Sequence, residues 1–388
     1  MPRKNSRTAN GSGTIRKRSD GRWEGRASLG RDPLTGKLIR KSIFGATEGE
    51  VRKKLTAMTA AVDDGTYTEP SKLTVSQWID VWAAEYLGDI KPNTATEYQS
   101  VCKTHLKPAL GAVKLTALST HTIQTLYNRL HRDAGLSAKT IKNINGVLHK
   151  CLQQAVELRY IRFNPASSTK LPRIEKTPVK PLNTEEMDAF IKAISGHRWK
   201  NLFTVALFTG MREGEVLGVT WSRVDFGSGS ILIDRQLQKI RATGEVKLVE
   251  PKNSKSRRIT PAPFVMEALK DQRRQQAEWK LKAGKAWSNE QDLVFTNEIG
   301  HYLPFQTVYH NYKRIADSIG VQASTFHTLR HTYAVTALQA GDSAKDVQEA
   351  LGHHTAAFTL DVYGHVTEEM KIESAARMEQ FAKSKGLS

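Results

Sequence analysis

The heptapeptide Thr-Gly-Met-Arg-Glu-Gly-Glu occupies positions 209 to 215 of this chain of 388 residues. The apolar run over residues 201–208 predicts a helix that Gly210 interrupts, and a second helix is expected to start at Arg212. Glu215 follows Arg212 by three residues, about one helical turn, so the Arg212 and Glu215 side chains can form an ion pair. Taken alone, this spacing indicates a structural pair, so its meaning depends on the rest of the chain.

Four further polar segments follow in the C-terminal half: Pro-Lys-Asn-Ser-Lys-Ser-Arg-Arg at 251–258, His-Thr-Leu-Arg-His at 327–331, Leu-Gly-His-His at 351–354 and Leu-Asp-Val-Tyr-Gly-His at 360–365. Their side chains suit phosphoryl transfer. Arginine binds phosphate oxygens bidentately and stabilises the charge of a five-coordinate phosphorus. Tyrosine is a nucleophile when a base or a cationic pocket favours its ionisation, and histidine accepts protons near neutral pH.

Metal chemistry is the main alternative at these segments. His327 and His331 are four residues apart, which also suits two zinc ligands on a helix, and His353, His354 and His365 follow. However, no cysteine lies in the region, and the sequence contains no His-Glu-x-x-His motif, no Walker loop and no carboxylate cluster for a pair of magnesium ions. The sequence therefore favours a site without a metal.

The charge of the chain predicts a polyanionic partner. Lysine and arginine number 58 against 39 acidic residues, a net charge of +19. Residues 1–178 hold 30 basic and 15 acidic residues, whereas residues 179–388 hold 28 and 24. A charge that served solubility alone would be spread evenly, so we expect two nucleic-acid-binding modules in the first 178 residues.

Neither a membrane nor an oxidising compartment is expected. No apolar run approaches the roughly 20 residues of a transmembrane helix. The first residues, Met-Pro-Arg-Lys-Asn-Ser-Arg, lack the apolar stretch of a secretion signal. Two cysteines, Cys102 and Cys151, cannot form a disulfide framework. The cytoplasm is therefore the expected location.

Residues 1–66 predict a small domain that begins with a disordered basic tail over residues 1–12. Runs typical of strands at 13–18, 21–29 and 38–44 predict a three-stranded sheet, with turns at 20–21 and 32–36. A capping box from Thr47 to Glu50 predicts a helix to about residue 62. A β-ribbon lined with arginine can enter a DNA major groove. The expected DNA contacts here are Arg16, Arg18, Arg22 and Arg26.

Residues 73–165 predict a helical domain, with apolar residues at helical spacing from Val75 to Trp82 and again at 94–106, 121–130 and 140–158. On its polar faces we expect phosphate contacts from Lys91, Lys139 and Lys142. The proline-rich segment that follows predicts a linker over residues 166–180.

Residues 181–388 predict an α+β domain. The expected helices cover 184–194, 201–208, 264–283, 305–319, 327–339, 343–351 and 355–362. The expected strands cover 230–238, 245–249, 257–260 and 293–296. A last amphipathic helix is expected over 367–384.

The five segments, in this order, resemble the tyrosine recombinase (phage integrase) family. Residues 1–65 look like the arm-binding domain of integrases from phages and conjugative transposons. The resemblance implies a multidomain fold, with a small β3α N-terminal domain, an all-α core-binding domain of the SAM-like type and an α+β catalytic domain. It implies site-specific strand exchange, integration and excision through a 3′-phosphotyrosine and a Holliday junction, without a cofactor.

The resemblance also implies roles for individual residues. Arg212 and Arg330 match the two arginines that clamp the scissile phosphate, and Glu215 matches the buried acid that orients the first of them. His327 matches a residue that binds the phosphate and transfers protons, and His353 one that hydrogen-bonds it.

The remaining assignments concern the nucleophile and the acid. Tyr363 matches the nucleophile, and Lys252 matches the β-hairpin lysine that protonates the 5′-oxygen, with Lys255 as the alternative. His331 and His354 are not part of the family set and are interpreted as structural. Arg257, beside the lysine segment, is expected to contact DNA.

The implied partners are double-stranded DNA at core and arm attachment sites, three further copies of the chain in a tetramer, and an excisionase or a host DNA-bending protein. The implied location is the bacterial cytoplasm, in association with the nucleoid. Two alternatives use the same residues: a DNA-relaxing enzyme of the type IB topoisomerase kind, and a non-catalytic, sequence-specific DNA-binding regulator. The basic N-terminal module argues against the first, and the complete set of site residues against the second.

Overall fold

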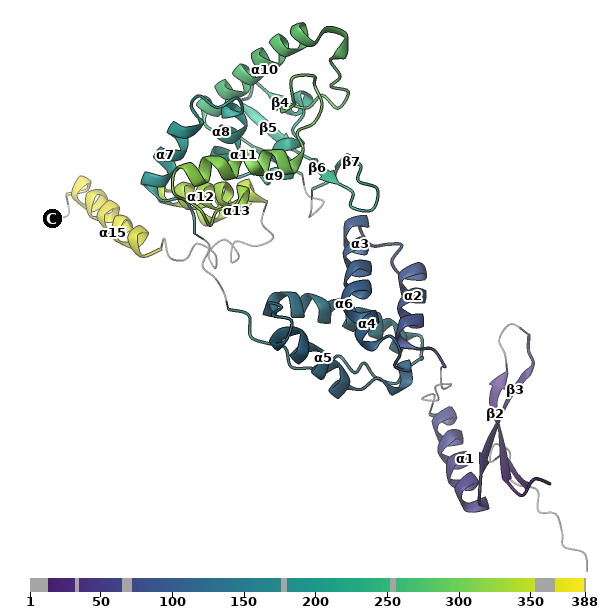
Figure 1. Cartoon of the computed structure of the whole chain (residues 1–388). Coiled ribbons are helices and arrows are strands. Elements are labelled where there is room, and N and C mark those ends of the chain that lie inside the picture. The colour runs from purple at the N-terminus through teal and green to yellow at the C-terminus, as the bar shows by residue number, and fades with distance from the viewer. Residues whose placement is uncertain are drawn as a thin grey trace, which may run out of the picture. The chain divides into compact units, whose positions relative to one another are not determined.

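The computed structural model describes residues 13–31, 35–64, 72–175, 180–251, 256–352 and 367–386 (Figure 1). The chain divides into two compact units, Met1–Ile174 and Glu175–Ser388. Within the described ranges, no helix combines the length and the apolar character needed to cross a membrane.

The first unit begins with the predicted sheet. Strands β1 (Thr14–Lys17), β2 (Trp23–Arg31) and β3 (Leu38–Gly45) are antiparallel in the order β1-β2-β3. Alternate residues of β2 lie on opposite faces. Ala27 packs against Leu55 and Met58 of α1 (Glu48–Asp63), and Glu24 and Arg26 lie on the face opposite this helix.

The capping box at the start of α1 forms only in part. Thr47 Oγ1 accepts a hydrogen bond from Glu50 N at 3.2 Å, as predicted. The Glu50 carboxylate, however, accepts from Ala46 N at 3.0 Å instead of returning to Thr47. The expected tail, and residues 32–34 of the second expected turn, lie outside the described residues.

The rest of the first unit is helical, as predicted. Its elements are α2 (Val75–Glu85), α3 (Pro92–Val101), the π-helical turn η1 (Cys102–Leu106), α4 (Lys107–Leu110), η2 (Leu115–Ala117), α5 (Thr120–Arg132) and α6 (Ala138–Glu157). Trp78 and Trp82 are buried in its core, and Trp78 Nε1 donates to Cys151 O at 3.0 Å. The Cys102 and Cys151 thiols are free and buried, and burial raises the pKa of Cys102 to about 11.

The first part of the expected linker belongs to this helical module. Gln124 on α5 binds the backbone of Lys170 twice, with distances of 2.7 Å to its N and 2.9 Å to its O. Thr120 Oγ1 donates to Pro165 O at 2.8 Å, and Leu171 packs against the core. The chain therefore leaves the module later than residue 166. Proline and serine content predicts irregular backbone, but it does not reveal these contacts from α5.

The second unit mixes helices with short strands. Its helices are α7 (Thr184–Ile194), α8 (Lys200–Thr209), α9 (Glu213–Leu217), η3 (Trp221–Arg223), α10 (Pro263–Ala283), η4 (Gly284–Ala286), α11 (Phe305–Ser318), α12 (Phe326–Gln339), α13 (Ala344–Leu351) and α15 (Thr367–Ser384). Its strands are β4 (Val224–Asp225), β5 (Ser230–Ile233), β6 (Gln236–Lys239), β7 (Val246–Val249) and β8 (Arg257–Ile259). One sheet has the order β4-β5-β8, and β6 and β7 form a separate hairpin.

Two strand predictions were wrong in this unit. The expected strand over 230–238 is interrupted at Asp234 and Arg235, and its halves join different sheets. Residues 293–296 make only isolated bridges, Thr220 with Leu293 and Thr296 with Tyr302. The Gln276 side chain of α10 explains the second difference, because its Nε2 donates to Leu293 O and Val294 O, which a neighbouring strand would otherwise bind.

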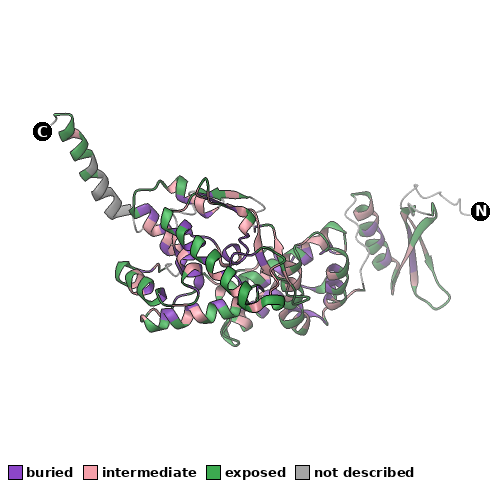
Figure 2. Ribbon diagram, turned by 90° about the horizontal axis from the view of Figure 1, so that it is seen from above, coloured by how far each residue is buried: buried purple, intermediate pink, exposed green. Residues whose placement is uncertain are grey.

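Helix α8 lies at the centre of the core of this unit, where Leu202, Phe203 and Val205 are fully buried. Helix α15 differs: in Figure 2 the described part of it is exposed along almost its whole length. Its Met378 and Phe381 side chains are 65% and 58% exposed. The expected helix over 355–362 lies outside the described residues.

Candidate active site

A tight turn brings Arg212 into position. Helix α8 is followed by Gly210, which has the left-handed φ of +61° that favours glycine. A Cβ atom there would lie 2.4 Å from the Tyr333 ring and 2.6 Å from Leu351 Cδ2, so both the backbone conformation and the packing require glycine. The turn directs the chain into α9, with Arg212 at its N-terminus.

Glu215 is fully buried below Arg212. Its carboxylate accepts four hydrogen bonds: from Arg212 N at 2.9 Å, Arg212 Nη1 at 2.8 Å, Arg257 Nη1 at 3.0 Å and Arg257 Nη2 at 2.7 Å. Burial by itself raises the pKa of this carboxyl, but the hydrogen bonds and charges of Arg257 and Arg212 outweigh it and lower the pKa to about 2. Glu215 is therefore a fixed anion between two guanidinium groups.

Arg330 reaches the same place from α12. Its residue surface is only 2% exposed, and its guanidinium donates to two backbone carbonyls. Nη1 binds Gly210 O and Nη2 binds Leu351 O, both at 2.8 Å. Arg330 thus joins the turn before Arg212 to the end of α13.

His327 lies one turn before Arg330 on α12, near the helix start. Desolvation, together with the charges of Arg330 and Arg212, lowers the pKa of His327 to about 4, although part of the residue stays exposed. The imidazole is therefore neutral at pH 7 and able to accept a proton. We call Arg212, Glu215, His327 and Arg330 the cationic site.

His331 packs against this site. Its ring lies 4.6 Å from that of His327, at an interplanar angle of 87°. Burial, with the charges of His327 and Arg330, lowers the pKa of His331 to about 4. The pair therefore has two neutral imidazoles in contact at neutral pH.

These two pKa values predict a loss of stability in acid. The ordinary histidine value is 6.5, so between pH 6.5 and 4 the unfolded chain binds more protons than the folded chain. The free energy of unfolding should then fall as the pH drops through this window. Thermal unfolding followed at intervals from pH 7.5 to 4.5 should show a falling midpoint, with a shallower slope for His331→Gln.

The matched control is His310→Gln, which changes an exposed histidine on α11. This variant should keep the wild-type slope. Equal slopes for His331→Gln and the wild type would show that the His327–His331 pair does not titrate as described.

Four of the predicted site residues lie outside the described residues: Lys252, Lys255, His353 and Tyr363. The structure does show what borders the lysines. Strand β7 pairs with β6, and β8 pairs with β5, so residues 252–255 connect two separate sheets. The strands on either side of this segment therefore do not pair with each other, and the assignment of Lys252, with Lys255 as the alternative, stays a prediction.

The zinc alternative finds no support in the described ranges, where no group of three or more histidine, cysteine, aspartate or glutamate side chains could hold a metal ion. His353, His354 and His365 are outside those ranges.

No role was predicted for Glu213, which is the first residue of α9 and directly follows the N-cap residue Arg212. Burial raises the pKa of Glu213 to about 7. Its Oε1 has no hydrogen-bond partner among the described residues. No signal in the sequence marks this position, because the burial comes from packing distant in the chain.

The residues expected to contact DNA divide into four groups. Lys91, Lys139 and Lys142 are exposed on the helical module. Arg18 and Arg22 are largely exposed and pair with Asp20.

Arg16 and Arg26 flank the buried Glu24 in the N-terminal sheet. Their Nε atoms lie 2.9 and 2.8 Å from its carboxylate oxygens, and Ser42 Oγ donates to it at 2.8 Å. The hydrogen bonds of Arg26, Arg16 and Ser42 lower the pKa of Glu24 to about 2. The two arginine side chains stay 60% and 48% exposed, so Glu24 holds them at the surface of the sheet.

Arg257 differs from the other expected DNA contacts. Its side chain is 10% exposed, and Nε, Nη1 and Nη2 all donate to protein oxygens. The structure therefore does not place it as a DNA contact. The sequence could not show this, because the residues around an arginine in a polar segment look the same whether its side chain is buried or exposed.

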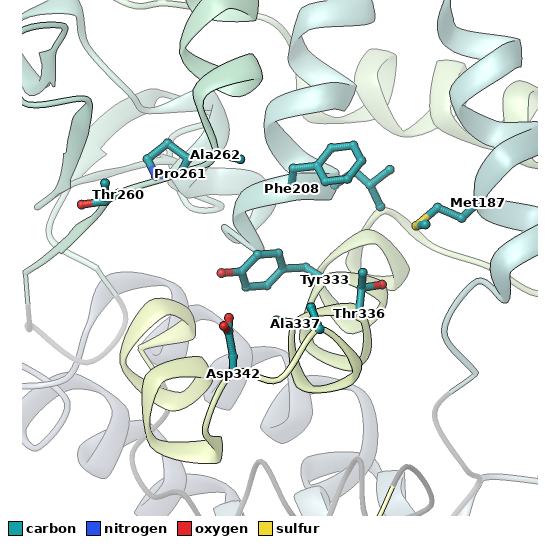
Figure 3. Close-up of a pocket in the computed structure, with 11 residues that line it drawn as sticks. Met187, Phe208, Thr260, Pro261, Ala262, Tyr333, Thr336, Ala337 and Asp342 are labelled. Atoms are coloured by element: carbon teal, nitrogen blue, oxygen red, sulfur yellow. The ribbon is translucent and has the colours of Figure 1, made fainter. Parts of the chain in front are cut away.

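A cavity of about 260 Å³ opens between α8, α12 and the segment after β8 (Figure 3). Met187, Phe208 and Ala337 give it an apolar lining, to which Tyr333 and Asp342 add polar groups. No residue of the cationic site lines it, so the cavity is a separate feature of this unit.

Comparisons with known proteins agree with this architecture. The model of the phage integrase family matches residues 180–370, and that of the phage integrase N-terminal SAM-like domain matches residues 74–131. A XerC-like tyrosine recombinase of Caldanaerobacter subterraneus is 32% identical over 363 residues, covering 89% of this chain and 92% of that protein. The ICEBs1 integrase of Bacillus subtilis is 23% identical and covers 94% of this chain and 99% of its own length.

Solved structures share the fold. The Tn1549 transposon integrase in complex with transposon right end DNA matches with a TM-score of 0.67 and 23% identity, covering 80% of this chain and 100% of that one. A lambda integrase tetramer bound to a Holliday junction matches with a TM-score of 0.55 and 18% identity, covering 92% and 97%. From the family match, the near full-length relative and the gathering of Arg212, Glu215, His327 and Arg330, it follows that this chain belongs to the phage integrase family of tyrosine recombinases.

Proposed function

We propose that this protein is the site-specific recombinase of a mobile element, which integrates and excises DNA through a 3′-phosphotyrosine. In this reaction the Tyr363 oxygen attacks a backbone phosphate, and the 5′-oxygen leaves with a proton from Lys252 or Lys255. The 5′-hydroxyl of a partner strand then attacks the phosphotyrosine and restores both the phosphodiester and the tyrosine. One bond replaces another at each step, so neither ATP nor a metal is needed.

A single observation supports this proposal most strongly. Arg212 and Arg330 bind Gly352 O and Leu351 O, at the end of α13, and the chain runs on from there to His353 and Tyr363. A phosphate held by these arginines would have its growing negative charge stabilised by guanidinium groups already fixed in place. His327, neutral at pH 7 and partly exposed beside them, would accept the proton that the Tyr363 hydroxyl loses when it attacks the phosphate.

The test is covalent trapping on a core-site duplex with a nick beside the cleavage position. After cleavage, the short fragment that carries the free 5′-hydroxyl diffuses away, so the covalent adduct cannot be resealed. The proposal expects protein joined to the 3′ end through Tyr363, identified by peptide mapping, and formed equally well in EDTA. A DNA-binding regulator would give no adduct. A relaxing enzyme of the topoisomerase kind would give adducts and relaxed plasmid but no recombinant joints.

In the proposed assembly, four protomers hold two duplexes and pass through a Holliday junction in the bacterial cytoplasm, at the nucleoid. Residues 73–165 and 181–388 clamp the core site. Helix α15 docks on a neighbouring protomer. Its exposed Met378 and Phe381, and the apolar cavity of Figure 3 that could receive such side chains, support this role. An excisionase or a host DNA-bending protein would set the direction of the reaction.

Deleting residues 1–66 tests the proposed arm-binding role of the N-terminal domain. Core-site cleavage should stay within about threefold of the wild type, whereas integrative recombination should fall at least about tenfold, because two linked DNA-binding modules hold DNA more tightly than one. Recombination on substrates with and without arm sites measures the effect.

The double variant Arg16→Gln, Arg26→Gln is the matched control within the full chain. It removes the two exposed charges at Glu24 and should reproduce part of the loss on substrates with arm sites. If the deletion leaves recombination unchanged, the N-terminal domain does not bind arm sites.

A further inference from the structure

Three arginines bind three consecutive carbonyls at the end of α13. Arg257 Nε donates to Ala350 O at 2.7 Å, Arg330 Nη2 to Leu351 O at 2.8 Å and Arg212 Nη2 to Gly352 O at 3.4 Å. The last carbonyls of a helix lack partners within it, and the helix dipole adds negative charge there. Arg212 and Arg330 have catalytic roles in the proposed reaction, but Arg257 has none.

Arg257 connects this helix end to the carboxylate below Arg212. Its two terminal nitrogens bind the two oxygens of Glu215 in parallel, while its Nε binds Ala350 O. Both Glu215 oxygens are shared with Arg212, through its Nη1 and its backbone N. One planar guanidinium therefore fixes the position of Glu215 relative to α13, and Glu215 fixes Arg212.

Arg257 also packs directly against Gly352, the residue that follows α13. A Cβ atom on Gly352, which has a φ of +64°, would lie 3.1 Å from Arg257 Nη1 and 3.3 Å from its Cδ. The path of the chain out of α13 thus depends on where this side chain lies. In sequence, Arg257 begins β8, directly after the segment that contains Lys252 and Lys255.

We infer that Arg257 is a positioning residue for strand cleavage: it holds Glu215, and through it Arg212, in register with the end of α13 that leads to the nucleophile. The inference rests on the proposed function. It differs from a DNA-binding role, because the guanidinium is turned inward and only 10% of the side chain is exposed.

Lysine cannot replace arginine in this role. A single ammonium carries the same charge, but it cannot bind both Glu215 oxygens and Ala350 O in the fixed geometry of a guanidinium. In Arg257→Lys the carboxylate and Arg212 should shift relative to the helix end. Misplacing a reacting group by about 1 Å can reduce its reaction rate about 100-fold.

The experiment measures single-turnover cleavage of a nicked core-site substrate by the full chain at saturating protein. Arg257→Lys should cleave about 10- to 100-fold more slowly than the wild type, with core-site affinity within about threefold. The matched control is Arg258→Lys, the same change one residue later, where the guanidinium binds Ser230 Oγ at 2.9 Å. It should cleave at the wild-type rate.

A pH profile separates positioning from folding. In Arg257→Met, Glu215 loses the largest of the contacts that lower its pKa, so cleavage should fall off at a higher pH on the acid side than in the wild type. A variant that merely folded less well would lose the same fraction of activity at every pH. If Arg257→Met does not fold, the pH profile of Arg257→Lys is compared with that of the wild type instead. Because lysine keeps the positive charge, a smaller shift of the acid limb of the profile is expected.

The outcomes are distinct. If the wild type forms no tyrosine adduct, the proposed function fails and this inference with it. If the wild type forms the adduct and Arg257→Lys cleaves within threefold of its rate, with an unshifted pH profile, Arg257 has no positioning role. Slower cleavage with intact DNA affinity and a shifted profile supports it.

Discussion

Replacing Tyr363 with phenylalanine is expected to abolish the covalent adduct between protein and DNA. The change removes one hydroxyl and leaves the ring, so core-site affinity should stay within about threefold, or about 0.7 kcal/mol. Cleavage should fall at least about 10³-fold, because without the nucleophile no phosphotyrosine can form. Denaturing gels of the trapped complex measure the adduct, and gel shifts measure the affinity.

Tyr309→Phe provides the matched control for this result. Tyr309 is an exposed tyrosine on α11, 38% accessible, and its loss should change neither cleavage nor binding. Adducts that persist in Tyr363→Phe would assign the nucleophile to another residue. Loss of both adduct and DNA binding would point to a structural role for Tyr363.

Replacing Glu215 with alanine should strongly destabilise the second unit. The variant leaves Arg212 and Arg257 facing a buried space without their carboxylate. Removing one partner of a buried ion pair typically costs about 3–5 kcal/mol, because an uncompensated charge remains inside. Urea unfolding of the full chain, followed through the transition of the second unit, measures the change.

The matched control is Glu298→Ala, which removes a carboxylate that pairs with Arg198 at the surface, where both side chains are about half exposed. Surface pairs contribute about 0–1 kcal/mol, so this variant should unfold nearly as the wild type does. A loss below about 1 kcal/mol for Glu215→Ala would contradict the structural role of the four hydrogen bonds.

The pH dependence of Glu215→Ala offers a second check. The pKa of Glu215 in the folded chain is about 2, below its ordinary value of 4.5. Its stabilising contribution is therefore complete above pH 4.5 and is lost as the pH falls toward 2. The variant should lack this part of the acid dependence.

Secondary structure was predicted best where the signals are local. The cap residue Thr47 predicted a helix start that the structure confirms, and the apolar spacing from Val75 to Trp82 predicted the helix that the structure shows as α2. The signals failed where a distant side chain decides the outcome. The Gln276 side chain of α10 donates hydrogen bonds to the carbonyl oxygens of residues 293 and 294. Nothing in the sequence of residues 293–296 predicts these bonds.

The sequence by itself determined which residues could perform the chemistry, because the order and spacing of the five segments are visible along the chain. It also determined the charge division between the basic N-terminal modules and the last 210 residues. The order of the segments is a local property and the net charge is a sum over residues. Neither depends on which residues contact each other in the folded protein.

Only the tertiary structure decided what Arg257 does. Its hydrogen-bond partners lie 42 and 93 residues away in the chain, at Glu215 and Ala350. An arginine in a polar segment can bind DNA when its side chain lies at the surface, or a carboxylate when its side chain is buried. Which partner Arg257 meets is decided by the packing of β8 against α13 and by the position of α9, and both depend on the buried core as a whole.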